Sequence, residues 1–347
     1  MHRLAPALGA LALALPAVPA AAAPDLYRPG NLIVIPQDGR AVYLQAFAAA
    51  RREIRIEICV LEDPQMLASL RAAVASGVRV RMIVDGGKYR SIAAERANLA
   101  PVVAAGGVLH VSNPVFPRSF PKVILIDGGR AIVGSLCLDS RTFARYRDYA
   151  YISADRTLIG DLSRLFSTDW AHSRPPGVAP PPFDPTPATR TPGLMVSPVT
   201  AVSRMVALYR GARRTLDVTS ELLGNRTLQS ELMAAVARGV RVRLIAPRQV
   251  NGGSPGVQRL QASSLAVLKA AGVDVHVTAK PESAARPYMH ARTAIADGRR
   301  AYLGSISLSP DSTTVNREVG LIVGARPVVA KLARWFAADF AGRSRPY

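Results

Sequence analysis

The chain repeats itself, and this internal duplication constrains its fold more than any other feature of the sequence. The stretch FPKVILIDGGRAIVGS, residues 120–135, reappears as HARTAIADGRRAYLGS in residues 290–305. Upstream, GVRVRMIVD (77–85) reappears as GVRVRLIAP (239–247), and NLIVIP (31–36) as GLMVSP (193–198). Matches that keep their order over this much sequence predict two structurally similar halves within one chain.

Each half alternates β-rich runs with a segment of helical spacing. The first half shows a strand pattern at 52–60, a helical pattern at 66–76 and a second strand pattern at 78–84, and the second half repeats this series at 215–219, 228–237 and 240–246. The series predicts an α/β fold in which each half has a mixed, mostly parallel sheet flanked by helices. A length of 347 residues with 49% hydrophobic content also exceeds what one core usually holds.

A proline-rich segment separates the two halves and sets the predicted domain boundaries. Residues 173–193 form the linker, because proline fixes φ and removes backbone donors, and the halves are residues 24–172 and 194–347. A disordered tether between independent domains is the alternative. Residues 1–22 resemble a cleavable signal peptide, since Arg3 precedes an apolar run and then small residues. We prefer this to a retained anchor because the run is short and broken by proline, and we expect a periplasmic or secreted protein.

The duplicated block resembles the signature of the phospholipase D superfamily, His-x-Lys-x4-Asp followed by Gly-Ser, over residues 31–335. The resemblance implies two halves packed around a pseudo-twofold axis with one active site at the seam, so a monomer suffices. It also implies that one histidine attacks phosphorus, a second protonates the leaving alcohol, and two lysines with the groups near Gly-Ser hold the phosphoryl oxygens. No metal or other cofactor is implied.

The second copy keeps most of the residues of this signature: His290, Asp297, Gly304, Ser305, Asn316 and Glu318. Arg292 replaces the lysine, which retains the charge and offers a bidentate fork to phosphate. Ser307 stands where the family commonly has Asn. The resemblance therefore implies catalytic roles for His290, Arg292 and Asp297, and supporting or phosphate-binding roles for Ser305, Asn316 and Glu318. We expect Glu318 to orient the His290 ring.

The first copy departs further from the signature. Lys122, Asp127, Gly134 and Ser135 match, and the resemblance implies catalytic roles for Lys122 and Asp127 and phosphate binding for Ser135. Its replacements are Phe120 for the histidine, Cys137 for Asn, and Tyr146 and Asp148 for the downstream Asn and Glu. The site would hold one histidine where the family uses two, and loss of general acid catalysis typically costs about 10²- to 10⁴-fold in rate. Three other histidines fit sheet-face or surface positions instead: His110, His276 and His172.

These residues predict a phosphodiesterase that acts on phospholipid-type diesters by hydrolysis or headgroup transfer. The alternatives are an impaired protein that binds phosphate or anionic lipid without turnover, and a nuclease. Lys and Arg number 44 against 24 Asp and Glu, and the net charge of +20 favours polyanionic partners such as an anionic membrane surface. Aromatic residues make up only 6%, which favours lipid over nucleic acid, because stacking platforms are sparse.

Two further residue pairs leave alternatives open. Cys59 and Cys137 could form a disulfide, but sequence does not show proximity, so we favour two buried thiols. No cysteine or histidine cluster has zinc or iron spacing. Glu62 and Glu221 each follow the first βα strand of their half, where a carboxylate lines the cleft or caps the next helix.

Overall fold

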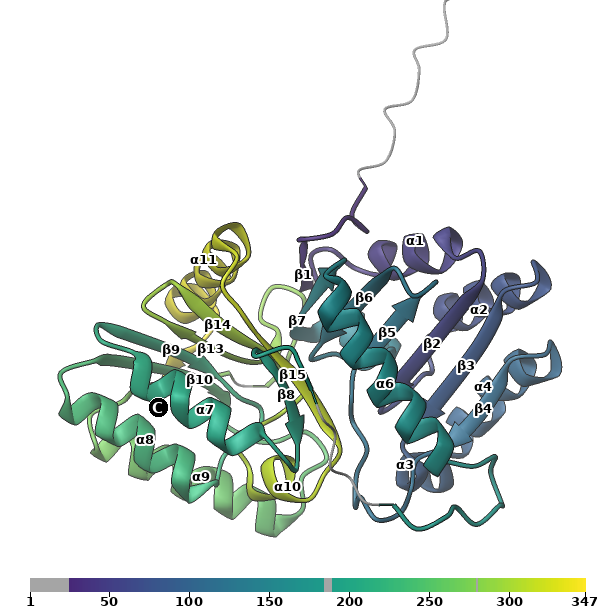
Figure 1. Ribbon diagram of the computed structural model, residues 1–347. Helices are drawn as coiled ribbons and strands as arrows, with labels where there is room; N and C mark the ends of the chain where they lie inside the picture. Colours follow the sequence, from purple (N-terminus) through teal and green to yellow (C-terminus); the bar gives the residue numbers. More distant parts are fainter. Residues whose placement is uncertain (1–24, 184–188, 279) are drawn as a thin grey trace, which may run out of the picture.

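The computed structural model describes residues 25–183, 189–278 and 280–347 and shows two α/β halves side by side (Figure 1). The predicted signal peptide, residues 1–22, lies outside the described residues. Apart from an additional helix in the first half and two additional two-residue strands in the second, the described parts of the halves share one order of elements. The strand, helix and strand series predicted in each half is confirmed.

The first half contains the following elements: β1 (Leu32–Ile35), α1 (Ala41–Ala49), β2 (Glu53–Ile58), α2 (Pro64–Ala75), β3 (Arg79–Val84), α3 (Gly86–Ser91), α4 (Ala93–Ala104), β4 (Val108–Val111), β5 (Val123–Ile126), β6 (Arg130–Gly134), α5 (Ser140–Arg145), β7 (Tyr146–Ser153) and α6 (Arg156–His172). Helix α2 begins where the Asp63 carboxylate accepts the backbone N–H groups of Gln65 and Met66, with Pro64 at the first helical position. This N-cap satisfies donors that the first turn leaves unpaired.

The second half repeats the plan with these elements: β8 (Leu194–Ser197), α7 (Ala201–Gly211), β9 (Thr215–Thr219), α8 (Arg226–Ala237), β10 (Arg241–Pro247), α9 (Pro255–Ala270), β11 (Asp274–Thr278), β12 (Tyr288–Met289), β13 (Arg292–Ala296), β14 (Arg300–Gly304), α10 (Pro310–Thr314), β15 (Glu318–Val323), α11 (Arg326–Gly342) and β16 (Arg345–Pro346). Asn225 caps α8 as Asp63 caps α2. Neither Glu62 nor Glu221 is therefore the cap of the helix that follows it.

The sheets are mixed, as predicted, but most of their pairings are antiparallel, which corrects the expectation of mostly parallel sheets. The strand orders are β1-β7-β6-β5-β2-β3-β4 and β16-β11-β10-β9-β13-β14-β15-β8. Only the βαβ strands β2, β3 and β4, and β9, β10 and β11, run parallel within these orders. Hairpins or short connections join β5, β6 and β7, and likewise β13, β14 and β15, and such connections impose antiparallel pairing.

The core has three parts, which give the molecule alternating layers of helices and sheets. One apolar cluster lies between the first sheet and α1, α2 and α4, and a second lies between the second sheet and α7, α8 and α9. The third joins the halves, because it combines α6 and α11 with strands of both sheets. Both sheets thus bury one face centrally and one face peripherally, which makes the seam part of the hydrophobic core.

Two glycines of the repeated block allow strands to approach closely. A Cβ atom on Gly134 would lie 2.6 Å from the Cβ of Ala150, and one on Gly304 would lie 2.3 Å from the Cα of Gly320. Neither space admits a side chain, so the motif glycines are required by the packing of β6 against β7 and of β14 against β15.

The described part of the linker packs against the first half. The Asn113 side chain donates to the carbonyl of Pro181 at 2.9 Å, and the rings of Phe116 and Phe183 meet edge to face with centroids 5.4 Å apart.

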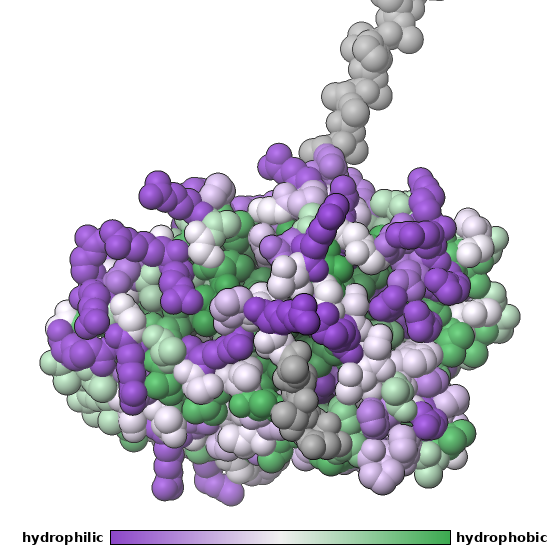
Figure 2. All heavy atoms as spheres, viewed as in Figure 1, coloured by the Kyte–Doolittle hydropathy of each residue, from purple (hydrophilic) through white to green (hydrophobic). Residues whose placement is uncertain are grey.

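Hydrophilic side chains are spread over both halves of the visible face, with hydrophobic areas between them (Figure 2).

Candidate active site at the seam

His290 lies between β12 and β13 and is buried. Its Nδ1 atom is 2.9 Å from both carboxylate oxygens of Asp148, which belongs to β7 in the first half. Its backbone N–H donates to the carbonyl of Arg147 at 3.2 Å. A carboxylate on Nδ1 fixes the ring and leaves the lone pair on Nε2, which Arg292 Nη1 approaches at 3.2 Å. The structure corrects the expectation that Glu318 orients this ring, because Asp148 of the opposite half holds that position.

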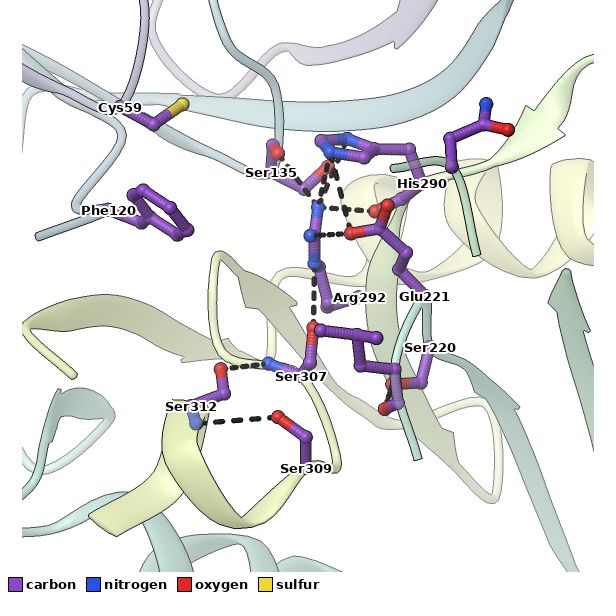
Figure 3. Close-up of polar contacts among 12 residues, drawn as sticks. Cys59, Phe120, Ser135, Ser220, Glu221, His290, Arg292, Ser307, Ser309 and Ser312 are labelled. Atoms are coloured by element: carbon purple, nitrogen blue, oxygen red, sulfur yellow. Dashed lines mark hydrogen bonds and ion pairs between the residues drawn. The ribbon is translucent and has the colours of Figure 1, made fainter. Parts of the chain in front are cut away.

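Arg292 is surrounded by acceptors beside the histidine (Figure 3). Its Nε donates to the hydroxyl of Ser307 at 3.0 Å, and Nη1 donates to the carbonyls of Ser135 at 3.2 Å and His290 at 2.5 Å. Its Nη2 forms an ion pair with Glu221. Ser307, in the position of the family's Asn, therefore orients the guanidinium. The arginine is held in place but also engaged, so a phosphate has to compete for its N–H groups.

Glu221 lies on the Nε2 side of the histidine and resolves one open alternative. Its Oε2 is 3.6 Å from His290 Nε2, and its Oε1 accepts the Tyr288 hydroxyl at 2.9 Å. Glu221 thus lines the site. The equivalent Glu62 is not part of the site. Its backbone N–H donates to the carbonyl of Leu138, and in the described part of the chain its carboxyl makes no contact with the residues around His290.

Lys122 is the first-half cation of the site. Its Nζ donates to the carbonyl of Phe120 at 3.1 Å, and the ammonium lies 5.2 Å from the centroid of that ring. Burial lowers the pKa of Lys122 to about 8, and the charge of Arg292 acts in the same direction, while Glu318, Asp148 and Glu221 oppose it. A lysine with this pKa exchanges its proton near neutral pH, which an ordinary lysine does not do.

Glu318 begins β15 and faces the first half. Burial raises its pKa, while the charge of Lys122 and the hydroxyl of Ser312, which donates to Oε1 at 2.6 Å, oppose the rise. Asn316 lies beside it, with Nδ2 3.5 Å from the same oxygen. Glu318 and its neighbours therefore support the Lys122 side of the site.

The two predicted phosphate-binding serines support the carboxylates and their strands. The Ser135 hydroxyl donates to Asp148 at 2.5 Å and accepts the backbone N–H of Tyr149 at 3.1 Å. The Ser305 hydroxyl donates to the carbonyl of Val319 at 3.2 Å and accepts the backbone N–H of the same residue at 3.1 Å. Each serine thus fixes the start of the strand that carries a site carboxylate.

Phe120 occupies the place that His290 has in the other half. Its backbone N–H donates to the carbonyl of Arg317 at 2.7 Å, just as His290 donates to Arg147. Its ring faces the site opposite Arg292 (Figure 3). The structure therefore brings an apolar ring to the position where the resemblance implies a second histidine.

The motif carboxylates Asp127 and Asp297 lie away from the other site residues, in hairpin turns. Each has a positive φ, 54° and 53°, and is followed by a glycine that also has a positive φ. Asp127 accepts the backbone N–H groups of Arg51, Arg52 and Glu53 at 2.7–2.8 Å. Burial acts to raise the pKa of Asp127, but these donors outweigh it and lower the pKa. The carboxylates anchor type I′ turns to the start of the neighbouring strand.

Two buried ion pairs lock the halves beside the site. Arg147 on β7 pairs with Asp339 on α11, with Nε and Oδ2 2.6 Å apart, and Arg317 pairs with Asp169 on α6, with Nη2 and Oδ1 2.7 Å apart. Each arginine directly precedes a site carboxylate in the sequence. The backbone carbonyl of each arginine accepts the N–H of the residue at the histidine position of the other half. Sequence analysis missed these pairs and the role of Asp148, although all of them occupy equivalent positions of the two repeats.

Cys59 and Cys137 form a disulfide with Cα atoms 6.0 Å apart. The preference for two buried thiols is therefore wrong. Cys59 follows β2 and Cys137 follows β6, and the isolated bridge between Leu61 and Leu138 brings these two chain segments together. Cys137 stands at the repeat position of Ser307, so in the first half this position holds a disulfide sulfur and not a hydroxyl.

Neither a metal centre nor a membrane span is found in the part of the chain that the structure describes. No group of three or more His, Cys, Asp or Glu side chains there is arranged to hold a metal ion. No helix there has both the length and the apolar character needed to cross a membrane.

Comparison with known proteins identifies the family. The model of the family "Cardiolipin synthase, PLD-like domain" matches residues 43–170 and 205–340, one match in each half. The chain is similar to cardiolipin synthase of Geobacillus kaustophilus (23% identity over 87% of this chain and 65% of that protein) and to cardiolipin synthase A of Erwinia tasmaniensis (24% identity over 80% and 61%). It thus spans less than two thirds of the length of these relatives.

Solved structures share the fold at low sequence identity. Phosphatidylserine synthase of Haemophilus influenzae superposes with a TM-score of 0.71 at 12% identity, over 91% of this chain and 87% of that chain. Polyphosphate kinase of Porphyromonas gingivalis gives a TM-score of 0.65 at 16% identity, over 91% and 48%. With a family match in each half and the duplicated motif at the seam, the chain belongs to the phospholipase D-like domain family.

Proposed function

We propose that the protein is a phosphodiesterase of the phospholipase D type that acts on phospholipid-type diesters through a His290 nucleophile, without a metal. The contact that carries this proposal is the one between His290 Nδ1 and Asp148, which crosses the seam at 2.9 Å. An oriented imidazole with a carboxylate on Nδ1 is the arrangement that activates the other nitrogen as a nucleophile. The relatives' names, cardiolipin and phosphatidylserine synthases, support a phospholipid substrate.

In the proposed reaction, His290 Nε2 attacks phosphorus and forms an N–P bond while the bond from phosphorus to the leaving oxygen breaks. We assign to Lys122 and Arg292 the balance of the negative charge on the phosphoryl oxygens, because both are buried cations. Water in hydrolysis, or an alcohol in headgroup transfer, then attacks phosphorus and releases the histidine. Substrate has to displace the ion pair between Arg292 and Glu221 when it binds.

The leaving oxygen needs a proton, and the residue at the second histidine position is Phe120. We infer that Lys122 supplies it, because its ammonium is buried in the site and its pKa of about 8 lies close to neutral pH. The proton then returns from water or from the incoming alcohol. This assignment gives Lys122 two roles, charge balance and proton donation.

A second candidate is binding of a phosphate group without turnover. It is favoured by Phe120, which carries no proton donor, and by the contacts that engage Arg292 in the absence of a ligand. The net charge of +20 supports an anionic lipid surface as the partner in either case. A nuclease is the less favoured third class, because aromatic residues for base stacking are sparse.

Turnover in EDTA tests the proposal. Wild-type protein is incubated with anionic liposomes, zwitterionic liposomes and single-stranded DNA, beside His290→Ala and the matched control His172→Ala, whose ring lies at the end of α6. We expect release of headgroup from a liposome by wild type and His172→Ala only. Turnover that survives His290→Ala contradicts the nucleophile, and no turnover by wild type on any substrate favours the binding protein.

We also propose that the protein works in an oxidising compartment, periplasmic or extracellular. The disulfide between Cys59 and Cys137 supports this location, since such bonds are rare in the cytosol of mesophiles. Mass spectrometry of the chain isolated from its native cells should show oxidised cysteines and a start after the predicted signal peptide. Reduced cysteines in the native material would contradict the location.

A further inference from the structure

The site continues along one edge of the second sheet beyond His290. Strands β9, β10 and β11 run parallel, so their carboxyl ends meet at one edge. Glu221 follows β9, Arg248 directly follows β10, and Lys280 follows β11. The carboxyl ends of parallel strands are the edge at which α/β proteins bind ligands. Arg248 and Lys280 thus extend the edge that already carries the Glu221 side of the active site.

A cavity of about 230 Å³ lies at this edge and is lined by Arg248, Lys280, Arg345, Glu282 and Tyr288. Tyr288 is also a wall of the active site, because its hydroxyl donates to Glu221 and its ring centroid is 6.4 Å from that of His290. The cavity and the catalytic histidine are therefore neighbours separated by one side chain. A water molecule takes about 30 Å³ in the liquid, so the cavity has room for a phosphate group and several waters.

The cavity carries a surplus of positive charge. Arg248, Lys280 and Arg345 are exposed, and none of them forms an ion pair with an acidic residue in the described part of the chain. One acid, Glu282, lines the cavity, and its carboxylate is 3.4 Å from the side-chain nitrogen of Asn251. Three cations against one carboxylate attract a dianion, and arginine forks suit phosphate.

The first half lacks this feature. Gly86 stands at the repeat position of Arg248, and Arg118 stands at that of Tyr288. The Arg118 guanidinium fills the space beside Gly87, at 2.5 Å from where a Cβ atom would be. The basic cavity is therefore a property of the second half, the same half that supplies His290.

We propose that this cavity binds a second phosphate group of the substrate, which makes the substrate a phospholipid-type diester with a further phosphate in its headgroup. The inference rests on the proposed function, since the diester is the group placed at His290. A phosphate monoester carries a charge of about −1.5 to −2 at neutral pH, which matches the surplus of the cavity. Tyr288 lines the cavity and lies beside His290, so we expect a short carbon linker to span both sites.

Binding of two small probes tests the inference without turnover. Propyl phosphate and propane-1,3-diyl bisphosphate are titrated by calorimetry into wild type, Arg248→Gln/Arg345→Gln, and the control Arg299→Gln/Arg300→Gln. The control removes the same charge from exposed residues at the far end of the β13–β14 hairpin. We expect the bisphosphate to bind wild type and control at least about tenfold tighter than the monophosphate, and the double variant to lose that advantage.

Equal binding of both probes by wild type, or an undiminished advantage in the double variant, overturns the inference. Inorganic phosphate is the third probe. If its binding depends on Arg248 and Arg345 and the bisphosphate binds no more tightly than it does, the cavity holds a free anion and the substrate assignment is overturned. The same titrations with His290→Ala separate this inference from the proposed function. A bisphosphate advantage without liposome turnover by wild type leaves the cavity inference standing and overturns the proposed function. Wild-type turnover that is lost in His290→Ala, with no bisphosphate advantage, leaves the proposed function standing and overturns the cavity inference.

Discussion

The buried ion pair between Arg147 and Asp339 should stabilise the protein more than the equivalent pair between Arg317 and Asp169. Both partners are withdrawn from water, with exposed side-chain fractions of 0% and 2%, and the guanidinium meets the carboxylate through two bonds of 2.6 and 2.9 Å. Asp339→Asn leaves the arginine buried without its counter-charge. Breaking a buried pair in this way costs about 3–5 kcal/mol.

The expected shift in melting temperature follows from the size of the chain. An unfolding entropy of about 2.1 cal/mol/K per residue gives roughly 0.7 kcal/mol per degree for this chain, so Asp339→Asn should lower the Tm by about 4–7 °C. Arg343→Gln is the matched control, because Arg343 pairs with the same carboxylate from a partly exposed position at 3.1 Å. A surface pair contributes about 0–1 kcal/mol, and the control should shift the Tm by less than about 2 °C.

The equivalent variant in the first half, Asp169→Asn, should lower the stability less, because a second carboxyl group, that of Glu57, lies nearby. Burial raises the pKa of Glu57 well above its ordinary value, and the nearby charge of Asp169 raises it further, while Arg317 opposes both. Once the charge of Asp169 is removed, Glu57 can ionise and pair with Arg317. Scanning calorimetry of the three variants decides the matter. A shift below about 1 °C for Asp339→Asn, or a larger shift for Asp169→Asn than for Asp339→Asn, refutes this reasoning.

Three further predictions concern the site and the disulfide. Asp148→Asn keeps the shape of the side chain but removes the charge that orients His290, so kcat should fall by about 10⁴-fold in steady-state assays, and a loss below tenfold would argue against that role. The pKa of Lys122, lowered to about 8, predicts that affinity for dimethyl phosphate falls as the pH rises through 8, because the ammonium loses its proton; Lys122→Arg should bind equally at pH 7 and pH 9. Replacing Cys59 and Cys137 by serine should lower the free energy of unfolding by about 2–5 kcal/mol in urea, and reductant should destabilise wild type but not the variant.

The duplication allowed the fold to be predicted, because each repeated block corresponds to the same strands and helices in both halves. The sequence also contains a signal for the antiparallel direction of the strands. Asp127-Gly128 and Asp297-Gly298 are Asp-Gly pairs between apolar runs, the sequence signal of a type I′ hairpin and therefore of antiparallel pairing. The same geometry explains why these two aspartates serve the turns, whereas the motif alone placed them with the catalytic residues.

The partner of His290 could not be predicted from one half of the sequence. Glu318 lies closer along the chain and matches the family pattern, while Asp148 looked like a degenerate substitute. The choice depends on β12 crossing to pair with β7, which brings His290 to the first half. A pairing this remote in sequence leaves no local signal. The disulfide escaped prediction for the same reason, because it joins residues 78 positions apart.

The charges at the seam determine what a substrate has to do on arrival. The cations Arg292 and Lys122 already have carboxylates near them, so a phosphodiester adds a negative charge to a site that is close to balance. When the guanidinium of Arg292 turns to the substrate, Glu221 keeps the Tyr288 hydroxyl as a donor. Tyr288 also lines the basic cavity. Tyr288 is therefore a side chain that the ion pair of Arg292 with Glu221 and the cavity of the proposed second phosphate share.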